Sequence, residues 1–237
     1  MLETIKSIIL DFQETNLETG VPRRLQIETV RGKAAVCIGV RRSGKSTYLF
    51  QVIQRLIERG VSRQNILYLN FFDDRLHNLR QENLGLITEA YYSIFPKKKN
   101  SETIYCFFDE IQSVPGWEPF VDRMMRTEKC EIYITGSSAK MLSKEIATQM
   151  RGRALSWEMF PFSFREFLDY KGIEKENSLS TKKRLIVQKA FEEYWETGGF
   201  PEVLGLSRQL RLKIHQEYFH AILFRDLVER HDISHPK

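Results

Sequence analysis

Residues 39–46 read Gly-Val-Arg-Arg-Ser-Gly-Lys-Ser, and Thr47 follows them. This stretch fits the pattern G-x-x-x-x-G-K-[ST], which is known as the Walker A loop. A glycine-rich turn allows successive backbone N–H groups to point inward and bind phosphate oxygens. We expect the ammonium group of Lys45 beside the β- and γ-phosphates of a nucleotide and the hydroxyl group of Ser46 on Mg²⁺. The predicted phosphate-binding residues are Gly39, Arg42, Ser43, Gly44, Lys45, Ser46 and Thr47.

The segments on either side of this loop have the character that the motif requires. The apolar run Ala-Ala-Val-Cys-Ile at residues 34–38 is typical of a buried strand. From Thr47 to Glu58, apolar residues recur at helical spacing. A helix that begins near Gly44 directs the positive end of its dipole at a bound anion. Arg41 and Arg42 at the loop tip have two interpretations, solvated charge or contact with a partner or a phosphate.

The composition is that of a globular protein, because 42% of the 237 residues are hydrophobic and 28% are charged. No apolar run approaches the roughly 20 residues that a membrane helix needs, and we expect no signal peptide. Cys37 and Cys106 lie in apolar runs, so we expect buried thiols and, by default, a cytoplasmic protein. A net charge of +5 allows a nucleic-acid partner, but the scattered basic residues favour solvated surface charge.

Strand-like and helix-like segments alternate over the first 161 residues. We expect strands at 34–38, 65–71, 103–108, 131–135 and 154–159, and helices at 1–13, 47–58, 84–94, 115–126 and 139–150. This alternation predicts an α/β fold with three layers, in which helices cover both faces of a mostly parallel sheet. Beyond Pro161 only helices are expected, at 163–170, 182–196 and 209–231. We therefore predict a P-loop domain over residues 1–161 and a helical lid subdomain over 162–237 that continues beyond this chain.

Residues 104–110, Ile-Tyr-Cys-Phe-Phe-Asp-Glu, have the form of a Walker B element, an apolar strand that ends in two carboxylates. Asp109 is expected to orient Mg²⁺ through water, and Glu110 to orient the attacking water or accept its proton. Alone the pattern is weak, because acidic residues often close strands at a protein surface. Downstream of a Walker A loop it favours a catalytic function, and Glu beside Asp favours a hydrolase over most kinases and GTPases.

Two further positions complete the predicted catalytic set of Lys45, Glu110, Ser137 and Arg153. The fourth predicted strand leads into Thr-Gly-Ser-Ser at 135–138, which would bring a hydroxyl group close to the γ-phosphate as a sensor. Ser137 is the first choice for this role and Ser138 the second, although Ser138 equally suits the cap of the next helix. Arg153, or Arg151 near it, suits an arginine finger that acts on the nucleotide of its own chain or of a neighbour. The alternative is an exposed arginine pair in a turn.

Two other groups of residues carry weaker signals. Asp73 and Asp74 follow the second predicted strand and could approach the metal, but carboxylates at strand ends are commonly just solvated. The three tryptophans, Trp117, Trp157 and Trp195, are expected in the core rather than against a ligand.

Taken together, these stretches resemble the AAA-type ATPases. More specifically, the chain is similar to a prokaryotic family of ATP-binding proteins with an N-terminal AAA-like domain and a C-terminal domain of unknown function. The Walker pair is a generic feature, whereas Phe-Pro-Phe-Ser-Phe from Phe160 and Gly-Gly-Phe-Pro-Glu from Gly198 are more specific. The resemblance covers nearly the whole chain, but much of the second half of the family is missing here, so any effector function is in doubt.

The resemblance also implies features that spacing alone does not show. It implies a five-stranded sheet of order 5-1-4-3-2, with strands numbered along the chain. Gly199-Phe200-Pro201 is similar to a Gly-x-Pro signature of related signal-transducing ATPases. That similarity implies that Pro201 lies near the bound nucleotide.

Three functions compete at this point. The first is a Mg²⁺-dependent ATPase that couples the state of ATP or ADP to movement of the C-terminal helices. The second is an ATP-dependent switch or scaffold with little hydrolysis. The third is a nucleic-acid-stimulated motor, which we rank last because no second helicase core follows within 237 residues. An arginine finger that acts on a neighbour would require self-association.

Overall fold

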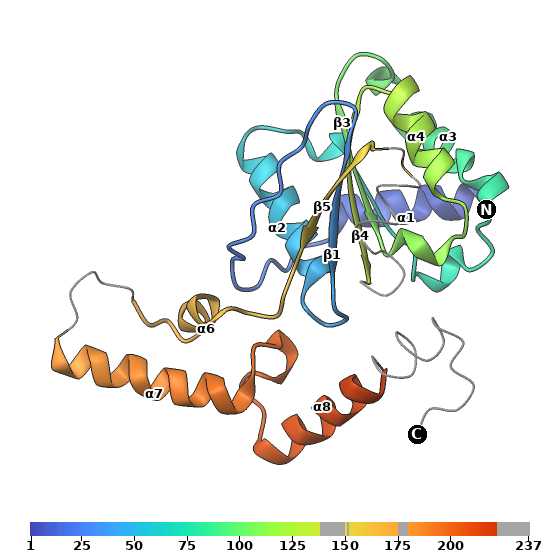
Figure 1. Cartoon of the computed structure of the whole chain (residues 1–237). Helices are drawn as coiled ribbons and strands as arrows, with labels where there is room; N and C mark the ends of the chain where they lie inside the picture. Colours follow the sequence, from blue (N-terminus) through green and yellow to red (C-terminus); the bar gives the residue numbers. More distant parts are fainter. Residues whose placement is uncertain (138–149, 151, 175–179, 222–237) are drawn as a thin grey trace. The chain divides into compact units, whose positions relative to one another are not determined.

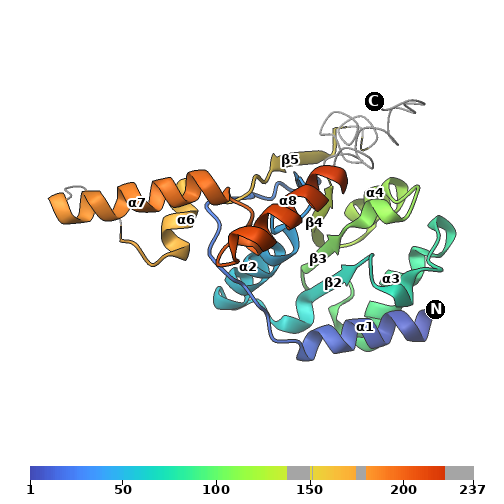
Figure 2. The same ribbon diagram turned by 90° about the horizontal axis from the view of Figure 1, so that it is seen from below.

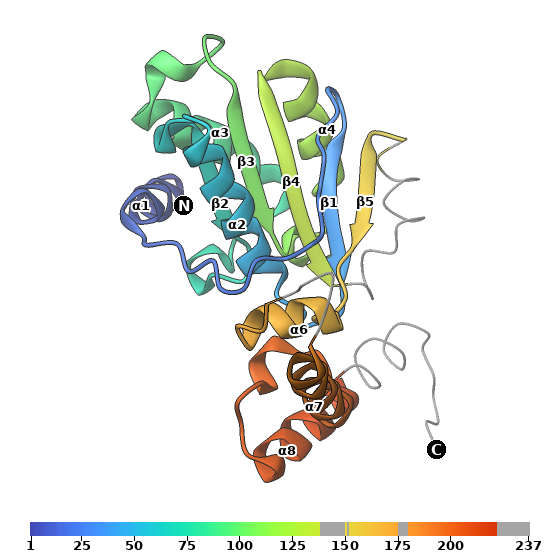
Figure 3. The same cartoon turned by 90° about the vertical axis from the view of Figure 1, so that its left-hand side faces the viewer.

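A five-stranded sheet forms the centre of the computed structural model, which describes residues 1–137, 150, 152–174 and 180–221. Figure 3 shows the strands side by side. In order across the sheet they are β2 (Ile66–Asn70), β3 (Ile104–Asp109), β4 (Cys130–Ser137), β1 (Ala34–Gly39) and β5 (Ala154–Glu158). The predicted order 5-1-4-3-2 is confirmed, and the pairs β1–β5, β2–β3 and β3–β4 are parallel.

The strand register brings the carboxyl ends of the strands to one edge of the sheet. Asn70 of β2 lies opposite Asp109 of β3, and Phe108 of β3 lies opposite Ile134 of β4. Ligands of open α/β sheets bind outside the carboxyl ends of the strands. The acidic end of β3 therefore lies where this rule expects a ligand.

The strands are apolar because helices cover both faces of the sheet. All six residues of β1 are buried, among them the predicted buried Cys37, and Cys106 of β3 is buried as well. Phe107 of β3 stacks on Tyr133 of β4, with ring centroids 4.6 Å apart. An aromatic pair at this distance contributes about 0.5–1.5 kcal/mol beyond the area that it buries.

Helix α2 (Lys45–Glu58) lies on one face of the sheet, whereas α3 (Gly85–Ile94) and α4 (Glu118–Thr127) lie on the other (Figures 1 and 2). Helix α1 (Leu2–Glu14) packs against α3 and β2. Trp117, directly before α4, is buried as expected. The helix that we predict at 139–150 lies outside the described residues except for its last position. Short 3₁₀ turns occupy Arg63–Asn65, Asp74–Leu76, Gln81–Asn83, Pro96–Lys98, Ile111–Ser113 and Pro201–Val203.

The chain divides into two compact units. The larger unit contains residues 1–19, 27–38 and 45–158, and the smaller contains residues 20–26, 39–44 and the chain from 159 onward. The smaller unit thus takes up the phosphate loop and a segment that precedes β1. The predicted boundary after residue 161 stays a prediction.

The smaller unit has its own apolar cluster, which includes Phe162, Phe167 and Leu168. Its helices are α6 (Phe164–Tyr170), α7 (Thr181–Thr197) and α8, which is described as Arg208–Ala221. The prediction of a buried Trp195 is wrong, because this residue of α7 is 80% exposed. Among the helices that the structure describes, none combines the length and the apolar character needed to cross a bilayer.

Candidate nucleotide-binding site

The carboxylate of Asp109 is the best-defined group at the acidic end of β3. It is fully buried, and hydroxyl groups from both neighbouring strands hold it. The Tyr68 hydroxyl of β2 donates a hydrogen bond to Asp109 Oδ2 at 3.0 Å, and the Thr135 hydroxyl of β4 donates one to Oδ1. Burial, together with the charge and the hydrogen bond of Asp109, raises the pKa of Tyr68 well above its usual value. Tyr68 therefore remains a protonated donor, and the carboxylate is held in one orientation.

Glu110 adopts a conformation that is rare for a residue with a side chain, with φ at 56°. Its backbone N–H donates a hydrogen bond to Thr135 Oγ1 at 3.1 Å, and Gln112 Nε2 donates one to Glu110 Oε2. A left-handed conformation costs about 1–2 kcal/mol for an ordinary residue. Strain of this kind persists where surrounding contacts enforce it, and it clusters at functional sites.

Lys45 is the first residue of α2, and its side chain is only 4% exposed. Its Nζ lies 3.7 Å from Glu110 Oε1. Ser46 and Thr47 follow in the first turn of α2 and are half-buried. The larger unit therefore brings Lys45 close to Glu110, the residue that follows Asp109.

The phosphate loop itself, residues 39–44, belongs to the smaller unit. Gly39 has no room for a side chain, because an added Cβ would lie 2.2 Å from the carbonyl oxygen of Met159. Gly44 has φ at 93°, a conformation that glycine adopts readily and other residues avoid. A Cβ on Gly44 would lie 3.9 Å from Cγ of Pro201, so Pro201 lies beside the loop.

Arg42, also in the loop, has φ at 63° and an exposed side chain. Its guanidinium group lies 3.4 Å from Glu202, which directly follows Pro201. Glu202 in turn accepts a hydrogen bond of 2.6 Å from the Tyr218 hydroxyl of α8. The tip of the phosphate loop is thus connected to a C-terminal helix within the smaller unit.

The structure does not bring Arg153 together with Lys45. Arg153 directly precedes β5, and its carbonyl oxygen accepts a hydrogen bond of 2.8 Å from the N–H of Ala34 at the start of β1. The phosphate loop follows the other end of β1. The Arg153 side chain pairs with Asp122 of α4, with a distance of 2.5 Å between the two groups. Because parallel strands share one direction, Arg153 lies at the amino edge of the sheet, opposite the edge that carries Asp109.

Of the other predicted site residues, some lie outside the described part of the chain and one has a structural role. Ser137 ends β4, but its side chain lies outside the described part of the chain, as do Ser138 and Arg151. Asp73 accepts hydrogen bonds from the backbone and the guanidinium group of Arg75, which holds the pKa of the Asp73 carboxyl below its usual value. Asp73 therefore acts as the cap of a 3₁₀ turn.

Sequence reasoning missed three residues of this arrangement, Tyr68, Thr135 and Gln112. Tyr68 and Thr135 were seen only as parts of strands. The signal available was a hydroxyl group near the carboxyl end of each strand that flanks β3. Gln112 belongs to a short 3₁₀ turn directly after Glu110, in a stretch that resembles the family but where no role was predicted for its side chain.

The oxygen groups near the end of β3 suit Mg²⁺, which needs few protein ligands, better than a metal ion that is coordinated by protein side chains alone. Among the described residues, no group of three or more His, Cys, Asp or Glu side chains could hold an ion. Mg²⁺ usually takes one or two protein oxygens and completes its shell with water and phosphate. The Asp109 carboxylate and the Ser46 hydroxyl provide such oxygens. In the loop, the buried Ser43 Oγ has no hydrogen-bond partner within the described ranges. This hydroxyl group is therefore available to bind a phosphate oxygen.

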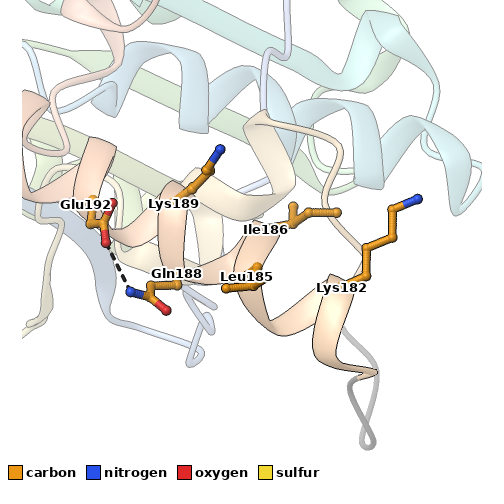
Figure 4. A pocket seen from close by; sticks show the side chains of 6 residues that line it. All are labelled: Lys182, Leu185, Ile186, Gln188, Lys189 and Glu192. Atoms are coloured by element: carbon orange, nitrogen blue, oxygen red, sulfur yellow. Dashed lines mark hydrogen bonds between the residues drawn. The ribbon is translucent and has the colours of Figure 1, made fainter.

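A surface hollow on α7 offers no comparable chemistry (Figure 4). Its lining comes from a single helix and consists of Lys182, Leu185, Ile186, Gln188, Lys189 and Glu192. Gln188 donates a hydrogen bond of 3.2 Å to Glu192 within the same helix. We assign no nucleotide to this hollow, since no polar group from another element among the described residues lines it.

The model of the AAA domain family matches residues 31–168, which is more than half of the chain. The chain belongs to the AAA domain family. This membership supports a nucleotide-binding ATPase at a general level. The AAA domain matched here contains the phosphate loop, β3 with Asp109, and β4 with Thr135.

Relatives from an archaeon and a bacterium share this domain. Protein MJ1544 of Methanocaldococcus jannaschii is 38% identical over 98% of this chain and 50% of its own length. A Haemophilus influenzae protein is 37% identical over 82% of this chain and 46% of its own length. The chain therefore spans about half the length of these curated relatives.

Solved structures with 12% sequence identity are also similar to the chain. PCH-2 of C. elegans has a TM-score of 0.47 over 94% of this chain and 67% of its own. DnaA of Aquifex aeolicus with bound AMPPCP has a TM-score of 0.44 over 94% of this chain and 63% of its own.

Proposed function

We propose that the AAA domain of this chain binds ATP with Mg²⁺, hydrolyses it, and transmits the state of the nucleotide to the C-terminal helices. The observation that carries this proposal is the buried Lys45 beside Glu110 at the end of a strand whose Asp109 is held by two hydroxyl groups. A phosphate loop precedes Lys45 directly in the chain. These are the parts that phosphoryl transfer needs, since it depends mainly on positioning and charge stabilisation.

The phosphate loop and the start of α2 bind ATP in this proposal. The backbone N–H groups of the loop bind phosphate oxygens, and Lys45 adds a positive charge beside the β- and γ-phosphates. Ser46 and Asp109 are the residues that would hold Mg²⁺, through the Ser46 hydroxyl and the Asp109 carboxylate. The ion neutralises charge on the phosphates when it is bound.

Hydrolysis falls to Glu110, which orients a water molecule and accepts its proton. Lys45 and Gln112 contact the two oxygens of Glu110, so binding of a phosphate beside Lys45 would free one of them. Ser137 stays our proposed sensor. Arg153 lies at the far edge of the sheet, so the arginine finger that we propose acts on the nucleotide of a neighbouring copy.

Coupling to the C-terminal helices runs through Arg42, Glu202 and Tyr218. The Arg42–Glu202 pair is exposed, and exposed ion pairs contribute only about 0–1 kcal/mol. A phosphate group near Arg42 would compete with Glu202 for the guanidinium group. If the guanidinium group of Arg42 left Glu202 for the phosphate, Glu202 and the Tyr218 hydroxyl of α8 would be free to rearrange.

The test combines nucleotide binding and single-turnover hydrolysis in two variants with matched controls. Lys45→Ala should abolish ATP binding, whereas Lys33→Ala, just before the opposite end of β1, should bind as the wild type does. Glu110→Gln should keep ATP binding and lower turnover by about 100-fold or more. Glu102→Gln, just before the opposite end of β3, should leave turnover unchanged. Undiminished hydrolysis in Glu110→Gln would remove Glu110 from its assigned role.

A second function, an ATP-dependent switch with little hydrolysis, is favoured by one observation. Both oxygens of Glu110 are engaged by side chains of the same unit, Lys45 and Gln112, and neither is left solely for water. The same single-turnover measurement separates the two functions. A wild-type rate as low as that of Glu110→Gln, together with tight ATP binding, would support the switch.

A further inference from the structure

Arg23 lies in residues 20–26, which precede β1 and belong to the smaller unit. Its side chain is only 6% exposed, and its guanidinium group makes contacts in three directions. Nε donates to Glu166 Oε1 at 3.0 Å, Nη1 donates to the carbonyl oxygen of Ser43 at 2.6 Å, and Nη2 donates to that of Phe160 at 2.5 Å. The guanidinium carbon also lies 4.9 Å from the ring centroid of Phe162. One buried cation thus joins the phosphate loop to the residues around the start of α6.

Glu166 is held as firmly as the arginine that it binds. It accepts hydrogen bonds from the backbone N–H groups of Arg24 and Ser163 and from the Ser163 hydroxyl, which caps α6. Burial alone would raise the pKa of Glu166, but these hydrogen bonds and the charge of Arg23 outweigh it and lower that pKa. Glu166 is therefore a charged anchor at neutral pH, and it fixes the position of Arg23.

The contact with Ser43 bears directly on phosphate binding. The carbonyl group of Ser43 and the N–H group of Gly44 belong to one planar trans peptide unit, in which they point in opposite directions. A hydrogen bond that fixes the carbonyl oxygen therefore also fixes the direction of the Gly44 N–H. Fixing the direction of this N–H group is important because Gly44 has φ at 93°, and glycine gives the peptide unit more freedom to rotate than any other residue.

We propose that Arg23 is a positioning residue for the phosphate loop, which directs the Gly44 N–H toward the phosphate of a bound nucleotide and ties the loop to the start of α6. The proposal rests on the proposed function of ATP binding. Arg23 itself need not touch the nucleotide. Its planar fork reaches two backbone carbonyls and one carboxylate at once, which a lysine ammonium group does not reproduce.

The test is the same conservative substitution at two adjacent positions, Arg23→Lys and Arg24→Lys. Lysine at position 23 keeps a positive charge for the buried Glu166, so the fold is preserved, whereas Arg23→Gln would leave that carboxylate without its cation. Arg24 is the matched control, because its guanidinium group pairs with Asp169 at 3.3 Å on the surface. The Kd values of ATP and ADP, the turnover at saturating ATP and the Tm are measured for each protein.

We expect Arg23→Lys to raise the Kd of both ATP and ADP by roughly ten-fold or more, because a charge-assisted contact on the loop is lost. Turnover at saturating ATP should change by less than about three-fold, since Lys45 and Glu110 lie on other elements. Arg24→Lys should match the wild type in all four quantities. This separation of affinity from turnover is not expected of a residue that only stabilises the fold.

Three results would overturn the proposal. The first is an Arg23→Lys protein that binds ATP within two-fold of the wild type. The second is equal loss of affinity in Arg23→Lys and Arg24→Lys. The third is an Arg23→Lys protein that fails to fold, which would give Arg23 a general structural role. A wild-type protein that binds neither ATP nor ADP would instead refute the proposed function on which this inference rests.

Discussion

Replacing Tyr68 by phenylalanine would test whether the environment of Asp109 serves metal binding. The substitution removes one hydroxyl group and keeps the ring, which packs against Phe12 with centroids 4.8 Å apart. The buried Asp109 carboxylate then loses the hydrogen bond to Oδ2 and keeps the one from Thr135. Its orientation is no longer fixed from both sides.

The expected size of the effect follows from that lost contact. A hydrogen bond to a charged group contributes about 1.5–3 kcal/mol to stability. For a chain of this length, each kcal/mol corresponds to about 2–4 °C in Tm, so Tyr68→Phe should lower the Tm by about 3–12 °C. Loss of a partner that orients a metal ligand commonly weakens metal affinity by about 10–100-fold. The Mg²⁺ concentration for half-maximal ATP hydrolysis should rise accordingly.

Tyr91→Phe provides the matched control. The Tyr91 hydroxyl is also part-buried, but it donates its hydrogen bond of 2.7 Å to a neutral acceptor, the carbonyl oxygen of Gln64. Its removal should cost about 0.5–1.5 kcal/mol and leave the Mg²⁺ dependence unchanged. The assay is ATP hydrolysis at fixed ATP over a series of Mg²⁺ concentrations. If both variants shift the Mg²⁺ dependence equally, or if neither does, our reasoning about Tyr68 is wrong.

Two further predictions concern hydrogen bonds inside each unit. Thr135→Val keeps the shape of the side chain but removes its contacts with Asp109 and Glu110, so turnover should fall by about 10–100-fold while the Kd of ATP stays within about two-fold. Thr127→Val on the surface of α4 is its control, and unchanged turnover in Thr135→Val would contradict the role given to Thr135. The second prediction follows from the lowered pKa of Glu166, whose contribution to stability is complete above the ordinary value of 4.5 and is lost as the pH falls toward the folded-state pKa. The Tm of the wild type should therefore fall more steeply than the Tm of Glu166→Gln as the pH falls below the ordinary value of 4.5, and parallel curves would contradict this account.

The sheet was predictable because its signals are local. Apolar runs of strand length alternate with helical periodicity, and the Walker loop marks which strand carries the phosphate site. The order of the strands came from the family resemblance and is confirmed. Glu110 directly follows β3, and Lys45 begins α2 after the phosphate loop, so local sequence signals were enough to predict that the two residues are close together.

Two of the missed residues, Tyr68 and Thr135, depend on contacts that are distant in sequence. Tyr68 and Asp109 are 41 residues apart, and Thr135 and Asp109 are 26 apart, so only the strand register makes them neighbours. The contact between Arg23 and Glu166 spans 143 residues. The hydroxyl groups of Tyr68 and Thr135 look like ordinary strand residues until the neighbouring strand is known.

Strand direction could have improved one further prediction. A residue that directly precedes a parallel strand lies at the amino edge of the sheet, which is where Arg153 lies. The prediction for Trp195 failed for a different reason. Aromatic residues are often buried, but Trp195 packs only beside Phe191 of its own helix among the described ring contacts, and Phe191 is itself exposed.

The position of β1 between β4 and β5 has a consequence for synthesis of the protein. Strand β1 ends at Gly39, but its first neighbour in the sheet begins only at Cys130, roughly 90 residues later. At about 5–20 residues per second, the ribosome needs about 5–18 s to make that stretch. During this interval an entirely apolar strand has no partner on either edge, which is the condition under which nascent chains aggregate or recruit chaperones. The strand that leads into the phosphate loop is therefore also the segment most exposed to misfolding during translation.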